Sequence, residues 1–133
     1  MSFEFLCAIN GLAQIWAVDG KFLGVLTSDK YDPHSISNSR SIYGSVCGAA
    51  SIRNSSGLYG SSNGVYSAYN PNCLHPPIIF YQEQPVLIVS KNTNLQNEVN
   101  GLPVVDPDLL LEYYTQIVHT VSSFKPAQAL VNK

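Results

Sequence analysis

Charged side chains are scarce in this sequence. Asp, Glu, Lys and Arg make up 12% of its 133 residues, about half of the share that soluble domains usually carry. The formal net charge is −2 and no basic cluster is present to neutralise phosphates, which argues against a nucleic-acid partner. The apolar share of 45% is that of a folded chain, because disordered chains combine few apolar residues with high net charge. We therefore expect a single domain over residues 1–133.

The sequence also lacks a long apolar run and any closely spaced pair of cysteines. Residues 5–18 are fairly apolar, but polar residues interrupt them and the stretch is too short to span a bilayer. The first residues, MSFEF, lack the basic start of a secretory signal. Cys7, Cys47 and Cys73 are an odd set, which suits free thiols in a reducing compartment. We expect a cytoplasmic protein without a transmembrane segment, which would reach a membrane-bound assembly only peripherally, through a partner.

What the sequence has in abundance is an internal repeat. Residues 35–50 (SISNSRSIYGSVCGAA) are followed directly by residues 51–66 (SIRNSSGLYGSSNGVY), and eight of the sixteen positions are identical. A third copy starts at Ser67 and breaks at Pro71. The stretch 31–75, rich in Ser, Gly, Asn and Tyr, has three interpretations: a disordered linker, an adhesive low-complexity tract, or ordered loops that reuse one design. The regular spacing of Ile and Tyr favours the ordered loops.

In ordered loops each repeated residue type has a structural role. The repeated residues are Ile36, Asn38, Tyr43 and Gly44, each of which recurs sixteen positions later. We expect the isoleucines to point inward and the asparagines to cap turns through their own backbone. The tyrosines should pack a ring and keep the hydroxyl hydrated or bonded, and the glycines should supply special dihedral angles. Because a solenoid needs about three stacked repeats, these loops must lean on the rest of the domain.

Two β-hairpins are predicted on either side of the repeats. The apolar runs IWAV and KFLGVL flank Asp-Gly at 19–20, the strongest short hairpin signal, and predict a hairpin over 14–27. The runs IIFY and PVLIV flank Gln-Glu-Gln at 82–84, a poorer turn, and predict a second hairpin over 77–90. Pro85 should lie at a strand start or an edge. We expect both hairpins to pair into one small antiparallel sheet and the polar residues 91–101 to form a loop.

A helix is predicted over residues 107–123. Asp106 is a good N-cap and Pro107 suits the first helical position. Leu110, Tyr114 and Ile117 recur at helical spacing. The predicted fold is therefore a β-rich α+β domain with two hairpins in a small antiparallel sheet, long ordered repeat loops between them, and one C-terminal helix.

Several short motifs recur together across a little over half of the chain. They are DGKFLG at 19–24, YDPHSISN at 31–38, the SI-x-N and YGS repeats, Asn-Pro at 70–71 and PPI at 76–78. In these motifs the sequence resembles a small family of uncharacterised bacterial proteins found mainly in cyanobacteria, from which it departs at Arg40, Ser41 and Glu83. The resemblance implies no activity and carries no catalytic residue. Its lineage implies a photosynthetic or thylakoid-associated assembly as the host.

The repeat tyrosines are the principal candidates for function. A surface of Tyr, Ser, Gly and Asn has the composition of binding loops, because Tyr offers a large rigid contact at low entropic cost. The alternative is that the rings pack the loops onto the sheet. The favoured function is a non-catalytic accessory or scaffold protein that binds a larger protein complex through these loops and the helix face. The candidate contact residues are Tyr31, Tyr43, Tyr59, Tyr66, Tyr69, Arg40 and Arg53.

Two other functions stay open. A small-ligand or calcium-binding module would need six to eight clustered oxygens, although the spacing here matches no known calcium loop. An enzyme would need Cys73, His75 and His34 to converge into a nucleophilic site, but the sequence has no paired carboxylates, phosphate loop or GxSxG motif. We therefore expect neither catalysis nor a cofactor. The candidate metal ligands are Asp19, Asp29, Asp32 and Asn38.

Overall fold

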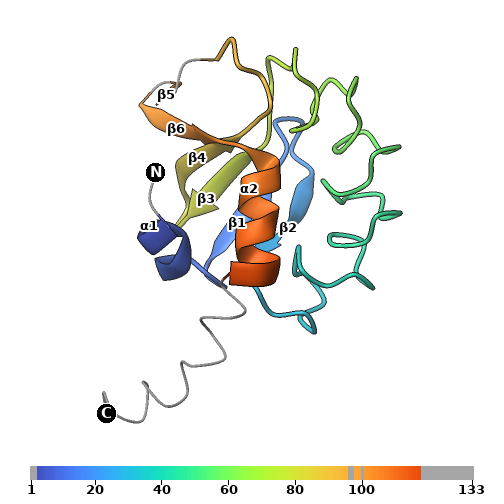
Figure 1. Ribbon diagram of the computed structural model, residues 1–133, viewed down its shortest axis with the longest axis vertical. Coiled ribbons are helices and arrows are strands. Elements are labelled where there is room, and N and C mark those ends of the chain that lie inside the picture. The colour runs from blue at the N-terminus through green and yellow to red at the C-terminus, as the bar shows by residue number, and fades with distance from the viewer. Residues whose placement is uncertain (1–2, 96–97, 100, 118–133) are drawn as a thin grey trace.

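A mixed β-sheet with helices on one face forms the body of the protein (Figure 1). The computed structural model describes residues 3–95, 98–99 and 101–117. The strands lie in the order β2-β1-β3-β4-β6-β5. The elements are α1 (Phe3–Ala8), β1 (Ala13–Trp16), β2 (Phe22–Leu26), β3 (Ile78–Tyr81), β4 (Gln84–Val89), β5 (Glu98–Val99), β6 (Leu102–Val105), α2 (Pro107–Glu112) and a π-helical turn η1 (Tyr113–Ile117). No helix in the described part of the chain is both long and apolar enough to cross a bilayer.

The two predicted hairpins are confirmed as β1–β2 and β3–β4. They pair through β1 and β3, which run antiparallel with Ile15 opposite Ile79. The second turn consists of Gln82 and Glu83, whose φ angles are 52° and 65°, so both central residues are left-handed as in a type I′ turn. Pro85 lies near the start of β4, beyond the residues of β4 that pair with β6, as expected.

The predicted antiparallel sheet of two hairpins is confirmed, and β6 extends it as an unpredicted strand that runs parallel to β4, with Ile88 opposite Val104. Residues 91–101 are not all loop, since β5 lies within them. The helix α1 was not predicted at all. These elements are short, and contacts distant in sequence hold them: the amide of Ser90 donates to the carbonyl of Val105, and the hydroxyl of Tyr114 donates to the carbonyl of Leu6.

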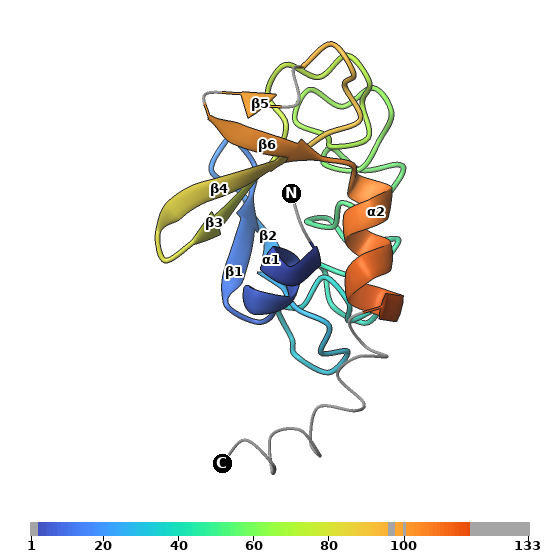
Figure 2. The same ribbon diagram turned by 60° about the vertical axis from the view of Figure 1, so that its left-hand side comes forward.

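The predicted C-terminal helix begins as expected. The side chain of Asp106 accepts a hydrogen bond from the amide of Asp108, and Pro107 occupies the first turn. The helix continues through η1 to Ile117, and the remaining predicted residues, 118–123, lie outside the described part of the chain. Figures 1 and 2 show α2 facing the sheet, with α1 to one side of α2.

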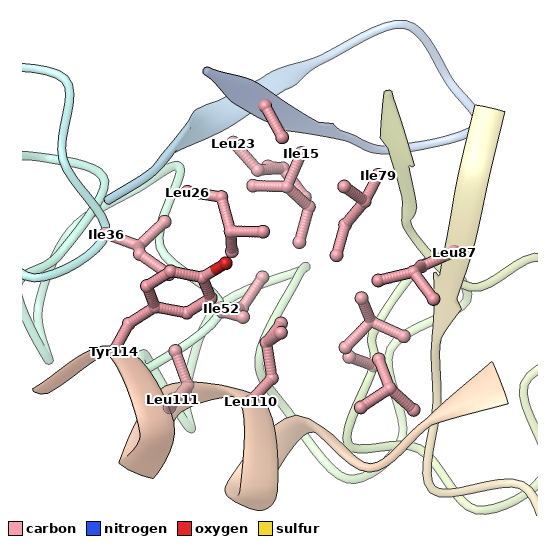
Figure 3. Close-up of a cluster of buried hydrophobic side chains, with 14 of the residues drawn as sticks. Ile15, Leu23, Leu26, Ile36, Ile52, Ile79, Leu87, Leu110, Leu111 and Tyr114 are labelled. Carbon is pink, nitrogen blue, oxygen red and sulfur yellow. The ribbon is translucent and has the colours of Figure 1, made fainter. Parts of the chain in front are cut away.

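The hydrophobic core lies between the sheet, α2 and the repeats (Figure 3). The sheet, the repeats and the C-terminal helix each contribute aliphatic side chains to it, and Tyr114 closes one side with its ring. The ten labelled core residues, each at most 6% exposed, are Ile15, Leu23, Leu26, Ile36, Ile52, Ile79, Leu87, Leu110, Leu111 and Tyr114. As predicted, the repeated isoleucines point inward.

The repeats form a coil of successive turns, residues 32–73, which we call the repeat coil. Asn38, Asn54 and Asn70 make the same two hydrogen bonds in each copy. The side-chain nitrogen donates to the carbonyl six residues earlier, at 3.0, 3.0 and 2.8 Å, and the side-chain oxygen accepts from the amide two residues later. The asparagines therefore cap turns as predicted, and the third copy extends past Pro71 instead of breaking there.

The predicted reason for the repeated glycines is wrong. Gly44 and Gly60 do not have positive φ angles. A Cβ atom at either position would instead lie under 3.0 Å from the backbone carbonyl oxygen of Asn38 or Asn54. The coil therefore needs glycine here because two stretches of backbone approach too closely for any side chain.

We expect Gly60→Ala to lower the free energy of unfolding by about 3 kcal/mol, because the methyl group would overlap a backbone carbonyl that cannot move alone. Ser55→Ala, at an exposed position of the same copy, should change it by less than about 0.5 kcal/mol. Urea unfolding of both variants measures the difference. Equal stabilities would contradict the close-approach explanation.

Candidate functional site

The repeat tyrosines mostly hold the coil in place. Tyr59 is 7% exposed, and its hydroxyl donates to the carboxylate of Asp19 at 2.8 Å. Burial, reinforced by this hydrogen bond, raises the pKa of Tyr59 to about 12. Tyr43 is half-buried and meets the ring of Phe22 edge-on, with centroids 5.0 Å apart. Tyr66 is half-buried against the core.

A charged network ties the end of the coil to the start of α2. The hydroxyl of Tyr69 donates to Asp108 at 2.6 Å, and Lys91 bridges Asp106 and Asp108 at 2.9 and 2.7 Å. The hydrogen bond from Lys91 lowers the pKa of Asp108. Tyr69 is therefore also engaged within the domain, and the remaining candidate tyrosine, Tyr31, is 90% exposed.

The two candidate arginines also differ in their exposure to solvent. Arg40 is exposed. Arg53 is half-buried, and its Nε donates to the carbonyl of Ile36 at 3.0 Å, which joins the second copy of the repeat to the first. Burial lowers the pKa of Arg53. Of the candidate contact residues, only Tyr31 and Arg40 are freely presented to a partner.

The candidate metal ligands do not assemble into a site. Asp29 and Asp32 each accept a hydrogen bond from the backbone amide two residues later, and Asn38 caps its own turn. Asp19 accepts the hydrogen bond of Tyr59, in the second copy. In residues 3–95, 98–99 and 101–117, no three His, Cys, Asp or Glu side chains are grouped so that they could hold a metal ion.

The cysteine and the two histidines of the enzyme hypothesis do not converge into one group in the described structure. Cys73 is 2% exposed, and its thiol donates to the carbonyl of Val65 at 3.0 Å. Burial raises the pKa of this thiol. Ser41 occupies the same repeat position and makes the equivalent bond to Pro33, so Cys73 has a structural role. His34 packs near Phe22 and Tyr43 at the other end of the coil, whereas His75 is exposed.

The face of the sheet turned away from α1 and α2 carries a hollow of about 690 Å³. Both described helices lie on the opposite face (Figures 1 and 2). The floor consists of two cross-strand pairs, Gln14 with Phe80 and Trp16 with Ile78. We call this site the outer hollow. Its lining residues are Leu12, Gln14, Trp16, Ala17, Val18, Gly20, Ile78, Phe80, Gln82 and Glu83.

Trp16 is fixed in the floor of the outer hollow. Its indole nitrogen donates to the side-chain oxygen of Gln14 at 3.0 Å, and its ring lies 5.1 Å from that of Phe22. Since Phe22 in turn contacts Tyr43, a row of aromatic rings leads from the hollow to the repeat coil. This site was not predicted from the sequence. Its only signal was the alternation in β1 and β3, which places Trp16 and Phe80 out of phase with the buried positions.

A second apolar feature lies on the repeat coil. Ile42, Leu58 and Leu74 occupy the same position in the three copies, and they are 52%, 49% and 73% exposed. At this position each copy therefore presents a large aliphatic side chain to solvent, although it buries the isoleucine or alanine at another position.

The hydrogen bond between Tyr59 and Asp19 predicts a loss of stability at alkaline pH. The folded state holds the Tyr59 proton more tightly than the unfolded state, so this stabilisation is complete below pH 10 and is lost as the pH rises towards 12. Tyr59→Phe should flatten the slope of unfolding free energy against pH in this window by up to about 1.4 kcal/mol per pH unit. Denaturant unfolding between these pH values measures it. Tyr31→Phe, at an exposed position, is the control, and equal slopes for wild type and Tyr59→Phe would contradict the assignment.

The burial of Cys73 predicts that this thiol is inert in the folded protein. Cys47 is exposed and should react with an aromatic disulfide reagent at the rate of a free thiol, whereas Cys73 should react only after unfolding. Mass spectrometry of the labelled peptides distinguishes the two. Rapid labelling of Cys73 under native conditions would revive the enzyme hypothesis.

Comparisons with known proteins identify no relatives of this chain. A scan against protein-family models finds no match, and searches of curated proteins and of solved structures find none either. The outer hollow is the most distinctive group of residues in the described part of the chain.

Proposed function

We propose that the protein is a non-catalytic accessory or scaffold protein that binds a larger protein complex through the outer hollow. The observation that carries this proposal is an aromatic and aliphatic surface that is left open on the sheet. Two cross-strand pairs place the half-buried rings of Trp16 and Phe80 in its floor. Both rings are accessible in a hollow that no described helix covers.

The composition of the outer hollow is that of the centre of a protein interface. Such centres are depleted in charged residues and enriched in aromatic ones, and Trp is prominent among the side chains that contribute most binding energy. Glu83 is the only charged residue among the lining residues. Leu12 and Val18, at opposite ends of β1, are 62% and 49% exposed, and a soluble monomer gains nothing from exposing them together.

The repeat coil contributes differently from the sequence prediction in this proposal. Most of its tyrosines hold the coil on the sheet, so the contact surface moves to the outer hollow. A second contact surface lies on the coil and at its start. It consists of the exposed residues Tyr31, Arg40, Ile42, Leu58 and Leu74. The proposed host remains a photosynthetic or thylakoid-associated assembly reached from the cytoplasm, which rests on the family resemblance alone.

A double substitution at the rim of the hollow tests the proposal. Leu12→Glu with Val18→Glu places charge in the contact surface and should reduce the recovery of the partner complex at least about tenfold. Because both positions are exposed, the melting temperature should change by less than about 3 °C. The measurement is affinity purification of the tagged full-length protein from its native cells, followed by quantitative mass spectrometry.

The matched control is Leu109→Glu, which introduces the same side chain at an exposed leucine of α2. This variant should recover the complex as wild type does. Undiminished recovery by the double variant would contradict the proposal, as would a wild-type protein that is recovered alone as a monomer.

A further inference from the structure

The turn at the rim of the outer hollow has an unfavourable sequence for its conformation. Gln82 and Glu83 both have positive φ angles, 52° and 65°. Two-residue turns of this kind prefer Asn-Gly, because a side chain with a Cβ atom is strained in the left-handed region. Asn-Gly at these positions would relieve the strain in the β3–β4 hairpin. Strained residues that a fold retains tend to cluster at functional sites.

Both strained residues line the outer hollow. Glu83 is exposed, and among the described residues its carboxylate takes part in no ion pair. The carboxylate of Glu83 is therefore available to a ligand. It is the only charged group among the residues that line the hollow. The strained turn places it there.

The shape of the outer hollow suits an extended segment of polypeptide. The hollow follows β1 and β3, with Leu12 and the turn of Gln82 and Glu83 at one end and Val18 and Gly20 at the other. The intervening strand β1 has four residues, which span about 13 Å. An extended peptide of about four residues has the same length, and the rings of Trp16 and Phe80 lie along its path.

We infer that the outer hollow binds an extended segment of the partner protein in which a Lys or Arg residue is flanked by apolar residues. The cationic side chain forms a charge-assisted hydrogen bond with Glu83, and the apolar neighbours lie on Trp16 and Phe80. Charge complementarity supports the choice of a basic segment: the net charge of the protein is −2, and the lining adds one negative charge and no positive one. This inference rests on the proposed function and specifies the partner's chemistry at the same site.

The chain contains one tryptophan, Trp16, and it lies in the floor of the hollow. Its fluorescence therefore reports on this site and on no other. The probe is a displayed library of random heptapeptides, selected on the immobilised full-length protein. The enriched sequences should share one Lys or Arg between apolar residues. A synthetic peptide of the enriched sequence should shift the Trp16 emission in a saturable titration.

Two variants then separate charge recognition from shape. Glu83→Gln keeps the size of the side chain and removes its charge, and it should weaken binding of the basic peptide about tenfold or more. Replacing Arg or Lys by Gln in the peptide should weaken binding to wild type equally, and should have no further effect on Glu83→Gln. Glu112→Gln removes an exposed charge on α2, outside the lining of the hollow, and should leave binding unchanged.

The double variant Gln82→Asn with Glu83→Gly tests the strain argument. It should raise the melting temperature by about 3–5 °C, because Asn-Gly suits the turn, and it should lose the basic peptide. A melting temperature that does not rise would overturn the inference that stability is sacrificed for this carboxylate.

Any of several results would overturn the inference. One is a library without enrichment of basic residues, and another is a selected peptide whose affinity is unaffected by Glu83→Gln. A third is a Trp16 signal that responds to phenethylamine as strongly as to the peptide, which would assign the hollow to small amines. If Leu12→Glu with Val18→Glu abolishes recovery of the complex while Glu83→Gln does not, the proposed function stands and the basic segment is excluded.

Discussion

The burial of one aliphatic side chain from each copy of the repeat holds the domain together. Ile36, Ile52 and Ala68 are fully buried against the sheet and α2, and each isoleucine contributes about 1.5–3 kcal/mol by leaving water. Few backbone hydrogen bonds join the coil to the sheet, chiefly those between Val25 and residues 34–36 at one end and between Lys91 and Ala68 at the other. The hydroxyls of Tyr59 and Tyr69 add hydrogen bonds from the coil to Asp19 and Asp108.

Because the repeat coil and both described helices share one face of the sheet, the other face receives no cover from them (Figure 2). An antiparallel sheet in this position usually presents polar side chains to water. Here the outward positions of β1 and β3 hold Trp16, Ile78 and Phe80 beside a single glutamine. The surface departs from the rule for solvated sheets over one continuous region, and a departure of that kind is expected where a sequence serves binding rather than folding.

Local signals in the sequence were enough to predict the hairpins, the start of α2 and the inward isoleucines, because turn chemistry, capping and spacing act over a few residues. The missed elements, α1 and β6, depend on partners far along the chain, such as the bond from Tyr114 to Leu6. Local signals also do not tell which of the candidate tyrosines are exposed, for a related reason. A tyrosine that holds the coil in place and a tyrosine that contacts a partner have the same local sequence. Which tyrosines are exposed depends on where the fold places Asp19 and Asp108.

The same packing couples the two apolar surfaces of the protein. Trp16 contacts Phe22, and Phe22 contacts Tyr43 in the first copy of the coil, while Asp19, in the turn that follows β1, accepts the hydrogen bond of Tyr59 in the second copy. A ligand in the outer hollow therefore touches residues that also position the coil. Well-packed interiors transmit small displacements instead of absorbing them. The repeat thus does more than lengthen a loop: by fixing two successive copies to the β1–β2 hairpin, it makes the outer hollow and the coil parts of one rigid unit.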